Sequence, residues 1–418
     1  MNICMFVTNP ISSDARVRHE AAHLSQAGHA VTVLGTPGPG LPATEDVGGV
    51  IFRRIGRIGH WMDPLLRSMV LRRRDDSGAS TASGGNGRKT VAPSASDIIW
   101  RVAPWIGALR TLVPWLPVAL TTRADVFHAH DLDTLVYAWT CSKLTGARLV
   151  YDSHELFVDW QRALGARPGM VAWYEAVERR CIKDASLVIT VSDGIAAELE
   201  REYGIDTPLV VRNCDRMRPL ADGTERLKGL YGGGSGRPVV LYQGGITAHR
   251  GLLEAAKAAD YCPDADFVFL GPDSRFKKGL MQAAGRARYG NVFVLPAVPQ
   301  DELWEYTCGA TIGLVLTQPF CRSYALSESN KLYQYMMAGL PIVAGSIESH
   351  QRVADETGAL VLADPYDPKA IAGAIIDLLE DEKRLRKMGR EGRSWAERKY
   401  NAVMELDKLT AAYDGFGP

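Results

Sequence analysis

The chain has 418 residues, and its 48 basic and 48 acidic side chains give a formal net charge of zero. This length suggests two or three domains, and a hydrophobic content of 46% excludes wholesale disorder. Zero net charge removes the usual electrostatic argument for binding a phosphate backbone, so no nucleic-acid partner is expected.

The seven cysteines are scattered and include no Cys-x-x-Cys pair, which argues against a disulfide framework or a structural zinc site. The N-terminus is apolar without a basic start, so it indicates a first strand rather than a signal peptide. No apolar stretch reaches the roughly 20 residues of a spanning helix, and the nearest candidate, 102–120, is broken by Arg110 and three prolines. We therefore expect a cytoplasmic protein, or one that is peripheral at the inner membrane surface.

Strand-length apolar runs alternate with helical patterns through the first half of the chain. The expected strands are residues 2–9, 29–35, 124–131, 147–154, 186–193 and 208–213, and the expected helices are residues 14–27, 132–145, 169–184 and 194–203. Strands that alternate with helices predict a parallel sheet with helices on both faces.

A change of composition marks the end of this first region. Residues 213–237 carry Pro, Gly and charge, and we interpret them as a connection with one short helix. The alternation then resumes, with strands expected at residues 238–244, 266–271, 291–298, 311–317, 341–346 and 359–364 and a charged helical tail from residue 367. The predicted fold class is α/β, with two doubly wound Rossmann-like domains, 1–212 and 238–399, facing across a ligand cleft.

An insertion interrupts the first domain at about residues 56–120. Its part at 76–96 is rich in Gly, Ser and Ala and is expected to be disordered. Basic and large apolar side chains flank that part: Arg53, Arg54, Arg57, Arg67, Arg72, Arg73, Arg74, Trp61, Met62, Leu65, Leu66, Met69, Trp105 and Trp115. The insertion is interpreted as an acceptor-binding or membrane-surface element. The alternative is a pair of surface helices with solvated arginines, and the prolines weaken any long amphipathic helix.

Two patterns are set aside. The glycine run at 232–236 precedes a strand, whereas a phosphate loop must follow one and open a helix, and no Gly-x-Gly-x-x-Gly follows the first strand. A nicotinamide or flavin enzyme is therefore disfavoured. The Asp131/Asp133 and Asp264/Asp266 pairs have a spacing that is common by chance, so no metal is expected.

Polar clusters follow three strands of the first domain, at the edge where ligands of such sheets bind. They are Asn9, Ser12, Ser13, Asp14 and Arg16; His128, His130 and Asp131; and Asp152, His154 and Glu155. His130 is closer to the strand end than His128, which is interpreted as a core residue. His154 has acidic neighbours where a strand becomes a loop, which favours a functional role. The acceptor-binding candidates are Asp14, Arg16, His130 and Asp131.

The second domain offers a site for an anion. Gly244 and Gly245 follow a strand and allow a ligand to approach the backbone. Arg250, near the start of the next helix, adds a side chain that can donate hydrogen bonds to a phosphate. Gly271 lies at another strand end. The segment 325–345 supplies Ser327, Ser329, Asn330, Lys331 and Gln334 at a further helix start. Such a helix suits a diphosphate, with Gln334 one turn deeper for a sugar hydroxyl.

The chain resembles the family 4 retaining glycosyltransferases of GT-B fold. The matching segments are SNKLYQYMMAGLPIVAG, ADVFHAHDLDTL, LVYDSHE, ASLVITVSDGIAAELEREYG and FVLPAVPQDELWEYTCGATIGLVL. They cover nearly the whole chain except residues 56–120. The resemblance implies transfer of a sugar from a nucleotide diphosphate sugar, usually UDP- or GDP-linked, with retention of configuration. It implies a donor bound mainly by the C-terminal domain and an acceptor bound by the N-terminal one.

The resemblance also implies roles for single residues. His154 takes the place of the histidine that contacts the donor sugar, Arg250 that of a cation gripping the diphosphate, and Val298 a place near the nucleobase. The last helix, about 400–418, would cross back to the first domain. The family often has two glutamates eight residues apart, where this chain has Leu326 and Gln334. Glu328 is the nearby carboxylate that could substitute.

The implied mechanism assigns catalysis to His154, Arg250 and Lys331. Helix amides and the two cations stabilise the departing diphosphate without a metal or another cofactor, and a phosphate oxygen takes the acceptor proton. The acceptor is a glycan, a lipid-linked saccharide or a natural product. Two other functions stay open: a nucleotide-sugar epimerase or hydrolase of the same fold, and a non-catalytic nucleotide-sugar-binding protein.

Overall fold

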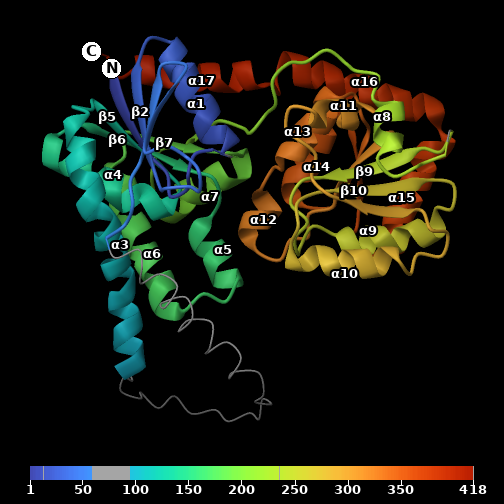
Figure 1. Cartoon of the computed structure of the whole chain (residues 1–418), viewed down its shortest axis with the longest axis horizontal. Coiled ribbons are helices and arrows are strands. Elements are labelled where there is room, and N and C mark those ends of the chain that lie inside the picture. The colour runs from blue at the N-terminus through green and yellow to red at the C-terminus, as the bar shows by residue number, and fades with distance from the viewer. Residues whose placement is uncertain (13, 59–94, 235, 418) are drawn as a thin grey trace. The chain divides into compact units, whose positions relative to one another are not determined.

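A computed structural model describes residues 1–12, 14–58, 95–234 and 236–417 (Figure 1). The chain divides into two compact units, residues 1–188 and residues 189–417, each described by itself below. The division falls inside a strand, before the connection expected at 213–237. The disorder expected at 76–96 falls almost wholly outside the described residues.

The first sheet has eight strands in the order β3-β4-β2-β1-β5-β6-β7-β8. Its strands are β1 (Asn2–Phe6), β2 (Ala30–Gly35), β3 (Thr44–Val47), β4 (Val50–Arg54), β5 (Val126–His130), β6 (Arg148–Ser153), β7 (Leu187–Thr190) and β8 (Leu209–Val210). β1 pairs in parallel with both β2 and β5, so the strand order reverses there. The hairpin of β3 and β4 is antiparallel and was not predicted from the sequence.

Helices follow most of these strands, as the alternation predicted. They are α1 (Ala15–Gln26), α3 (Ala95–Thr121), α4 (Leu132–Thr145), α5 (Phe157–Ala163), α6 (Pro168–Cys181) and α7 (Asp193–Tyr203), with a short η2 (Ile182–Asp184). Local chemistry sets their ends: Ser192 caps α7 by accepting a hydrogen bond from Ile195 N, and α4 ends at Gly146 in the left-handed conformation. The helix α5 was not predicted.

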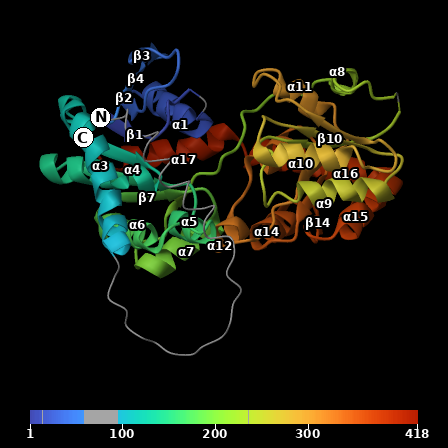
Figure 2. The same ribbon diagram turned by 60° about the horizontal axis from the view of Figure 1, so that its bottom comes forward.

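The helix α3 runs for 27 residues although it contains Pro104, Pro114 and Pro117. It packs against α4 and α6 (Figure 2). Trp115 on its inner face is fully buried, stacks on Phe6 at 6.0 Å and donates from Nε1 to the backbone oxygen of Ile55. A long helix therefore forms in spite of the prolines, and Trp115, which was expected from the sequence among the side chains of a binding insertion, belongs to the core. Burial of this face stabilises a helix that the prolines alone would weaken.

The second sheet has six strands, all parallel, in the order β11-β10-β9-β12-β13-β14. Its strands are β9 (Val239–Gln243), β10 (Asp266–Leu270), β11 (Val292–Leu295), β12 (Ile312–Val315), β13 (Ile342–Gly345) and β14 (Leu360–Ala363). The order reverses between β9 and β12, and ligands of such sheets bind beyond the carboxyl ends of the strands at that point.

Helices cover both faces of the second sheet (Figure 1), and a separate apolar cluster fills the space under each layer. The helices that follow in the chain are α8 (Thr224–Gly229), α9 (Leu252–Ala258), α10 (Arg275–Ala284), α11 (Leu303–Cys308), α12 (Arg322–Leu326), α13 (Asn330–Met337), α14 (Glu348–Thr357), α15 (Pro368–Glu380), α16 (Glu382–Arg398) and α17 (Ala402–Asp414), with η3 (Ala259–Tyr261). Of these, α17 contacts β8 through Lys408 Nζ, which donates to the backbone oxygen of Val210. The charged tail is thus three helices, started by the capping side chains of Asp367, Asp381 and Asn401. No described helix is both long and apolar enough to cross a membrane.

Candidate active site

Strands β5 and β6 end side by side, and their last residues carry the polar groups expected there. His130 pairs in register with Asp152, whose carboxylate is fully buried. Oδ2 of Asp152 lies 3.2 Å from His130 Nδ1 and 2.8 Å from His154 Nε2. Arg16 of α1 donates two hydrogen bonds of 2.8 Å to the same carboxylate. The structure therefore brings three predicted site residues together around Asp152, with Arg16 and His130 buried.

His154 is the accessible member of this network, with a side chain that is 21% exposed. Its Nδ1 lies 3.1 Å from Asp131 Oδ2, and its Nε2 faces Asp152. Ionised carboxylates only accept hydrogen bonds, so both ring nitrogens must donate, as they do in an imidazolium. Burial opposes that charge, but the carboxylates of Asp131 and Asp152 raise the pKa of His154 well above its usual range.

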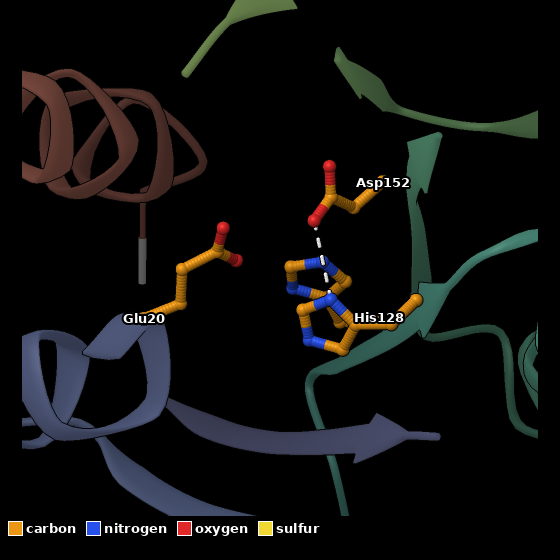
Figure 3. A group of neighbouring side chains, drawn as sticks. Glu20, His128 and Asp152 are labelled. Carbon is orange, nitrogen blue, oxygen red and sulfur yellow. Dashed lines mark hydrogen bonds and ion pairs between the residues drawn. The ribbon is translucent and has the colours of Figure 1, made fainter. Parts of the chain in front are cut away.

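Four buried side chains beside this network place their ligand atoms within 4.8 Å of one another: Glu20, His128, His130 and Asp152. Figure 3 shows Glu20, His128 and Asp152 pointing toward a common centre. However, both oxygens of Asp152 are already bound by Arg16, whose Nε also lies 3.0 Å from Glu20 Oε1. A guanidinium at this position opposes a second cation, so we interpret the group as a salt-bridge network and assign no metal to it.

Two other acidic side chains of this edge have structural partners. Asp14 caps α1 by accepting from Val17 N at 3.2 Å. Asp133 accepts from the Thr8 hydroxyl, and burial together with the charge of Asp131 raises the pKa of Asp133 to about 6. Asp131 has a side chain that is 33% exposed, so its carboxylate is reachable from solvent.

In the second unit, Gly244 follows β9 at the point where the strand order reverses. Its φ is +111°, and a Cβ placed on it would lie 3.1 Å from Cε and 3.3 Å from Nζ of Lys331. The ammonium of Lys331 is also 5.2 Å from the ring centroid of Tyr242. Burial, followed by the charge of Arg250, lowers the pKa of Lys331 to about 7. Lys331 is thus packed against the backbone of Gly244, and both were expected from the sequence to contact the bound ligand.

Arg250 supplies a second cation to this end of the sheet. Its guanidinium lies 4.9 Å from the ring centroid of Tyr324, and the turn that carries it contains His249 at a φ of 61°. Within the described part of the chain, no carboxylate forms an ion pair with Arg250 or with Lys331. Two cations without an acidic partner at a strand end form a site for an anion.

The start of α13 lies at the same place because Lys331 is its second residue. Ser329 caps the helix with an extended backbone and no side-chain hydrogen bond, and Asn330 is exposed. The first amides of a helix have no acceptor within it, which favours an anion there. Glu328 is buried, and its carboxylate binds Arg212 at 3.0 Å and also Arg352. Glu328 therefore holds the loop before α13 in place.

A small cavity, open to solvent, lies one turn deeper along α13. It is lined by Asp215, Arg218, Gln243, Gln300, Leu303, Trp304, Thr307 and Gln334. Gln243 donates from Nε2 to Gln334 Oε1 at 2.9 Å and accepts from the Thr307 hydroxyl at 2.7 Å. Of these residues only Gln334 was predicted. Trp304 and Thr307 are three residues apart in the helix α11, a spacing that could have indicated a shared face.

The remaining donor candidates lie around the strand ends. A Cβ on Gly271 would lie 2.2 Å from the backbone oxygen of Gly244, so Gly271 is needed for the close packing of these two turns. Gly245 is exposed and accepts from the Tyr242 hydroxyl at 2.6 Å. Val298 is half-buried against the apolar cluster under α13.

Comparisons with known proteins agree with this arrangement. The family model described as Glycosyltransferase Family 4 matches residues 15–214, and the one described as Glycosyl transferases group 1 matches residues 231–395. The GDP-mannose-dependent alpha-(1-6)-phosphatidylinositol monomannoside mannosyltransferase of Mycolicibacterium smegmatis is 27% identical over 309 residues, which cover 67% of this chain and 76% of that protein.

Solved structures show the same fold over the whole chain. The sucrose-phosphate synthase of Thermosynechococcus elongatus has a TM-score of 0.76 at 15% identity and covers 99% of this chain and 98% of its own. Anabaena HepE, in complex with UDP and glucose, has a TM-score of 0.69 at 13% identity, with coverages of 99% and 100%. The chain therefore belongs to glycosyltransferase family 4 and has the GT-B fold, with two Rossmann-like α/β domains.

Proposed function

We propose that this glycosyltransferase moves a sugar from a nucleotide diphosphate sugar, UDP- or GDP-linked, to an acceptor hydroxyl with retention of configuration. The observation that carries the proposal is the pair of cations at the start of α13. Lys331 and Arg250 have no acidic partner among the described residues, and Lys331 is buried enough to lower its pKa to about 7. Holding two such partly exposed cations near each other is unfavourable until an anion arrives, and a diphosphate supplies the matching charge.

In the proposed reaction, the bond between the anomeric carbon and the diphosphate oxygen breaks while both cations and the first amides of α13 stabilise the growing charge. A bond then forms between that carbon and the acceptor oxygen on the same face of the sugar. The acceptor proton moves to an oxygen of the departing phosphate, so charge and atoms balance without a metal. His154 contacts the donor sugar and orients it.

The side chains around the cavity beside Gln334 suit the nucleoside part of the donor by their chemistry. Trp304 offers an aromatic edge, and the amides of Gln243 and Gln334 offer hydrogen bonds to ribose hydroxyls. The relative from Mycolicibacterium smegmatis is named for GDP-mannose, and HepE was solved with UDP. Both nucleotides are therefore the first donors to test.

Titration calorimetry with UDP and GDP, and turnover with UDP- and GDP-sugars, test the proposal. We expect at least one nucleotide to bind and His154→Ala to lower turnover at least tenfold without loss of folding. A His154→Ala enzyme within about threefold of the wild type, under 1 kcal/mol, would remove His154 from the mechanism. Sugar consumption without any acceptor would instead support a hydrolase or epimerase, and binding without turnover would support a non-catalytic protein.

We also propose that the acceptor is presented at a membrane surface, through the described part of the insertion. The outer face of α3 carries a stripe of exposed apolar side chains: Trp105, Ile106, Leu109, Val113 and Leu120, between 37% and 54% exposed. The sequence from 98 to 124 contains three arginines and no acidic residue. An apolar stripe with arginines and a tryptophan is typical of helices that lie in the headgroup region of anionic bilayers. The relative named for a phosphatidylinositol monomannoside acceptor supports a lipid-linked acceptor.

Flotation with vesicles tests this surface separately from catalysis. We expect the wild-type chain to float with phosphatidylglycerol vesicles at low salt. The double variant Ile106→Asp/Leu109→Asp should remain in the dense fraction without vesicles. Met281→Asp, at a residue of α10 that is 55% exposed, is the matched control and should float like the wild type. A membrane-facing role would be contradicted if the α3 variant still bound the vesicles. It would also be contradicted if the wild type formed a dimer without lipid and the α3 variant did not, because the apolar stripe would then be a protein interface.

A further inference from the structure

Asp131 has a backbone conformation that aspartate rarely adopts. Its φ is 64° and its ψ is 161°, in a region that is essentially restricted to glycine. The residue connects β5 to α4, and its backbone is fixed on both sides: its N–H donates to Asp152 O at 2.9 Å, and its oxygen accepts from Thr134 N at 3.2 Å. Strain of this kind persists only where surrounding contacts hold it, and it concentrates at functional sites.

The side chain of Asp131 does not cap the N-terminus of α4, although its position would allow it to. Asp131 occupies the position that caps α4, where aspartate is among the preferred residues, but it makes no side-chain capping bond. At the corresponding positions of α1 and α15, Asp14 and Asp367 do make that bond. The carboxylate of Asp131 turns instead to His154 Nδ1, at 3.1 Å.

We propose that Asp131 is a positioning residue that holds the His154 ring against Asp152, so that both ring N–H groups are engaged and one face of the ring is presented to substrate. Asp152 holds the Nε2 side of the ring, and Asp152 is itself held in place because Arg16 binds it and it is buried. Asp131, which is partly exposed, holds the Nδ1 side of the ring, and its strained backbone keeps its carboxylate in place. The inference rests on the proposed role of His154, and it assigns to Asp131 a role different from direct acceptor binding.

These two carboxylates keep His154 positively charged at neutral pH. The raised pKa of His154 agrees with the geometry, since each N–H faces a carboxylate. The titratable and charged groups that act on the ring are Asp131 before α4, Asp133 of α4, Asp152 of β6, His128 and His130 of β5, and Arg16 and Glu20 of α1. An imidazolium beside the reacting sugar has no basic function, so His154 orients and cannot remove the acceptor proton.

Three variants of the full chain separate positioning from simple structural support: Asp131→Asn, Asp131→Ala and Asp131→Gly. The first readout is the His154 titration, followed by NMR of ¹³C-labelled histidine and assigned with His154→Ala. We expect Asp131→Asn to lower the pKa of His154 by about 1–3 units. We expect it to lower kcat at least tenfold while the KM for donor and the affinity for free UDP or GDP change less than threefold.

The second readout is thermal stability. Asp131→Gly relieves the strained backbone and should raise the melting temperature, or leave it unchanged, while activity falls; Asp131→Ala keeps the strain and should melt lower than Asp131→Gly. Asp367→Gly is the matched control, because Asp367 caps α15 from an ordinary conformation and its loss should lower stability and leave activity unchanged.

Two results would overturn the proposal: an unchanged His154 titration in Asp131→Asn, or an Asp131→Gly chain destabilised as much as Asp367→Gly. Loss of nucleotide binding in the Asp131 variants would also contradict it. If the wild type bound no nucleotide, the proposed function would fail, while the titration and the melting temperatures would still decide whether Asp131 clamps His154.

Discussion

The side chain of Lys331 lies over the backbone of Gly244, so close that a Cβ on Gly244 would be 3.1 Å from Lys331 Cε. This contact places an ammonium at the reversal point of the second sheet, with Arg250 nearby and no ion-pairing carboxylate among the residues that the structure describes. The first prediction follows from it. Lys331→Met should weaken UDP or GDP binding by about 10–100-fold, as expected for removing a charged hydrogen-bond donor of a phosphate.

Calorimetry measures this loss, and Lys257→Met is its control. Lys257 is an exposed lysine of α9, so its removal changes the net charge equally without touching the site. An equal loss of affinity in both variants would mean that the nucleotide responds to overall charge and that Lys331 makes no specific contact.

The second prediction concerns pH. Burial lowers the pKa of Lys331 to about 7 in the free protein, so above that pH its amine is mostly neutral. A bound diphosphate favours the charged form and raises the pKa again, so binding must take up a proton between about pH 7 and the new pKa. Nucleotide affinity should therefore be highest below about pH 7 and fall by up to about tenfold per pH unit above it.

Proton uptake is measured directly by calorimetry at pH 8 in buffers of different ionisation enthalpy. We expect nearly one proton taken up per nucleotide bound by the wild type and none in Lys331→Met. The lowered pKa also means that charging Lys331 costs free energy in the folded chain. This destabilisation is complete below about pH 7, and it decreases as the pH rises toward the ordinary pKa of lysine, because the amine is then neutral in the unfolded chain as well. Uptake of zero protons by the wild type would show that the charge of Lys331 does not change on binding, which contradicts this prediction.

The third prediction separates packing from ligand binding at Gly271. A Cβ there would meet the backbone oxygen of Gly244 at 2.2 Å, and backbone cannot move aside as a flexible side chain does. Gly271→Ala should lower stability by about 1–3 kcal/mol, as overpacking does. Gly373→Ala in α15, where nothing lies within 4 Å of the added Cβ, should stabilise by about 0.5–1 kcal/mol. Thermal unfolding compares them, and an unaffected Gly271→Ala chain would leave only a ligand to explain this glycine.

Much of the fold was accessible from the sequence because its strands are buried on both faces and alternate with helices. The strands at 126–130 and 148–153 were found for that reason, and the polar residues at their ends were expected at one sheet edge; the register of His130 with Asp152 comes from the structure. The hairpin of β3 and β4 was missed because β3 is largely exposed and lacks an apolar pattern. The helix α3 was doubted because its prolines are visible in the sequence, whereas the core that holds it is not.

The site was predictable in its residue types but not in its pairings. The sequence places His154 next to Asp152, yet only the fold shows that Asp131 supplies the second carboxylate. Arg16 and His130 look like binding residues in the sequence, but both are buried and bind the buried carboxylate of Asp152. Glu328 seemed free to replace a missing acidic residue, but it is bound by Arg212, which lies 116 residues earlier in the chain.

The last prediction addresses Gln334, which stands where the family often has a glutamate. Its Oε1 accepts a hydrogen bond from Gln243 Nε2 at 2.9 Å, and a glutamate oxygen could accept that bond equally well. Gln334→Glu should therefore fit the cavity and add a charged acceptor for the ribose hydroxyls. Hydrogen bonds to charged groups are roughly twice as strong as neutral ones, so affinity for UDP or GDP should rise about fivefold.

Calorimetry at pH 7.5 measures the change, with Gln300→Glu as the matched control. Gln300 lines the same cavity and is exposed, so it brings in the same charge away from the hydrogen bond to Gln243. A similar gain in both variants would indicate a general effect of charge in the cavity. Weaker binding in Gln334→Glu alone would place the nucleotide phosphates, rather than its ribose, next to this residue, because a carboxylate repels them.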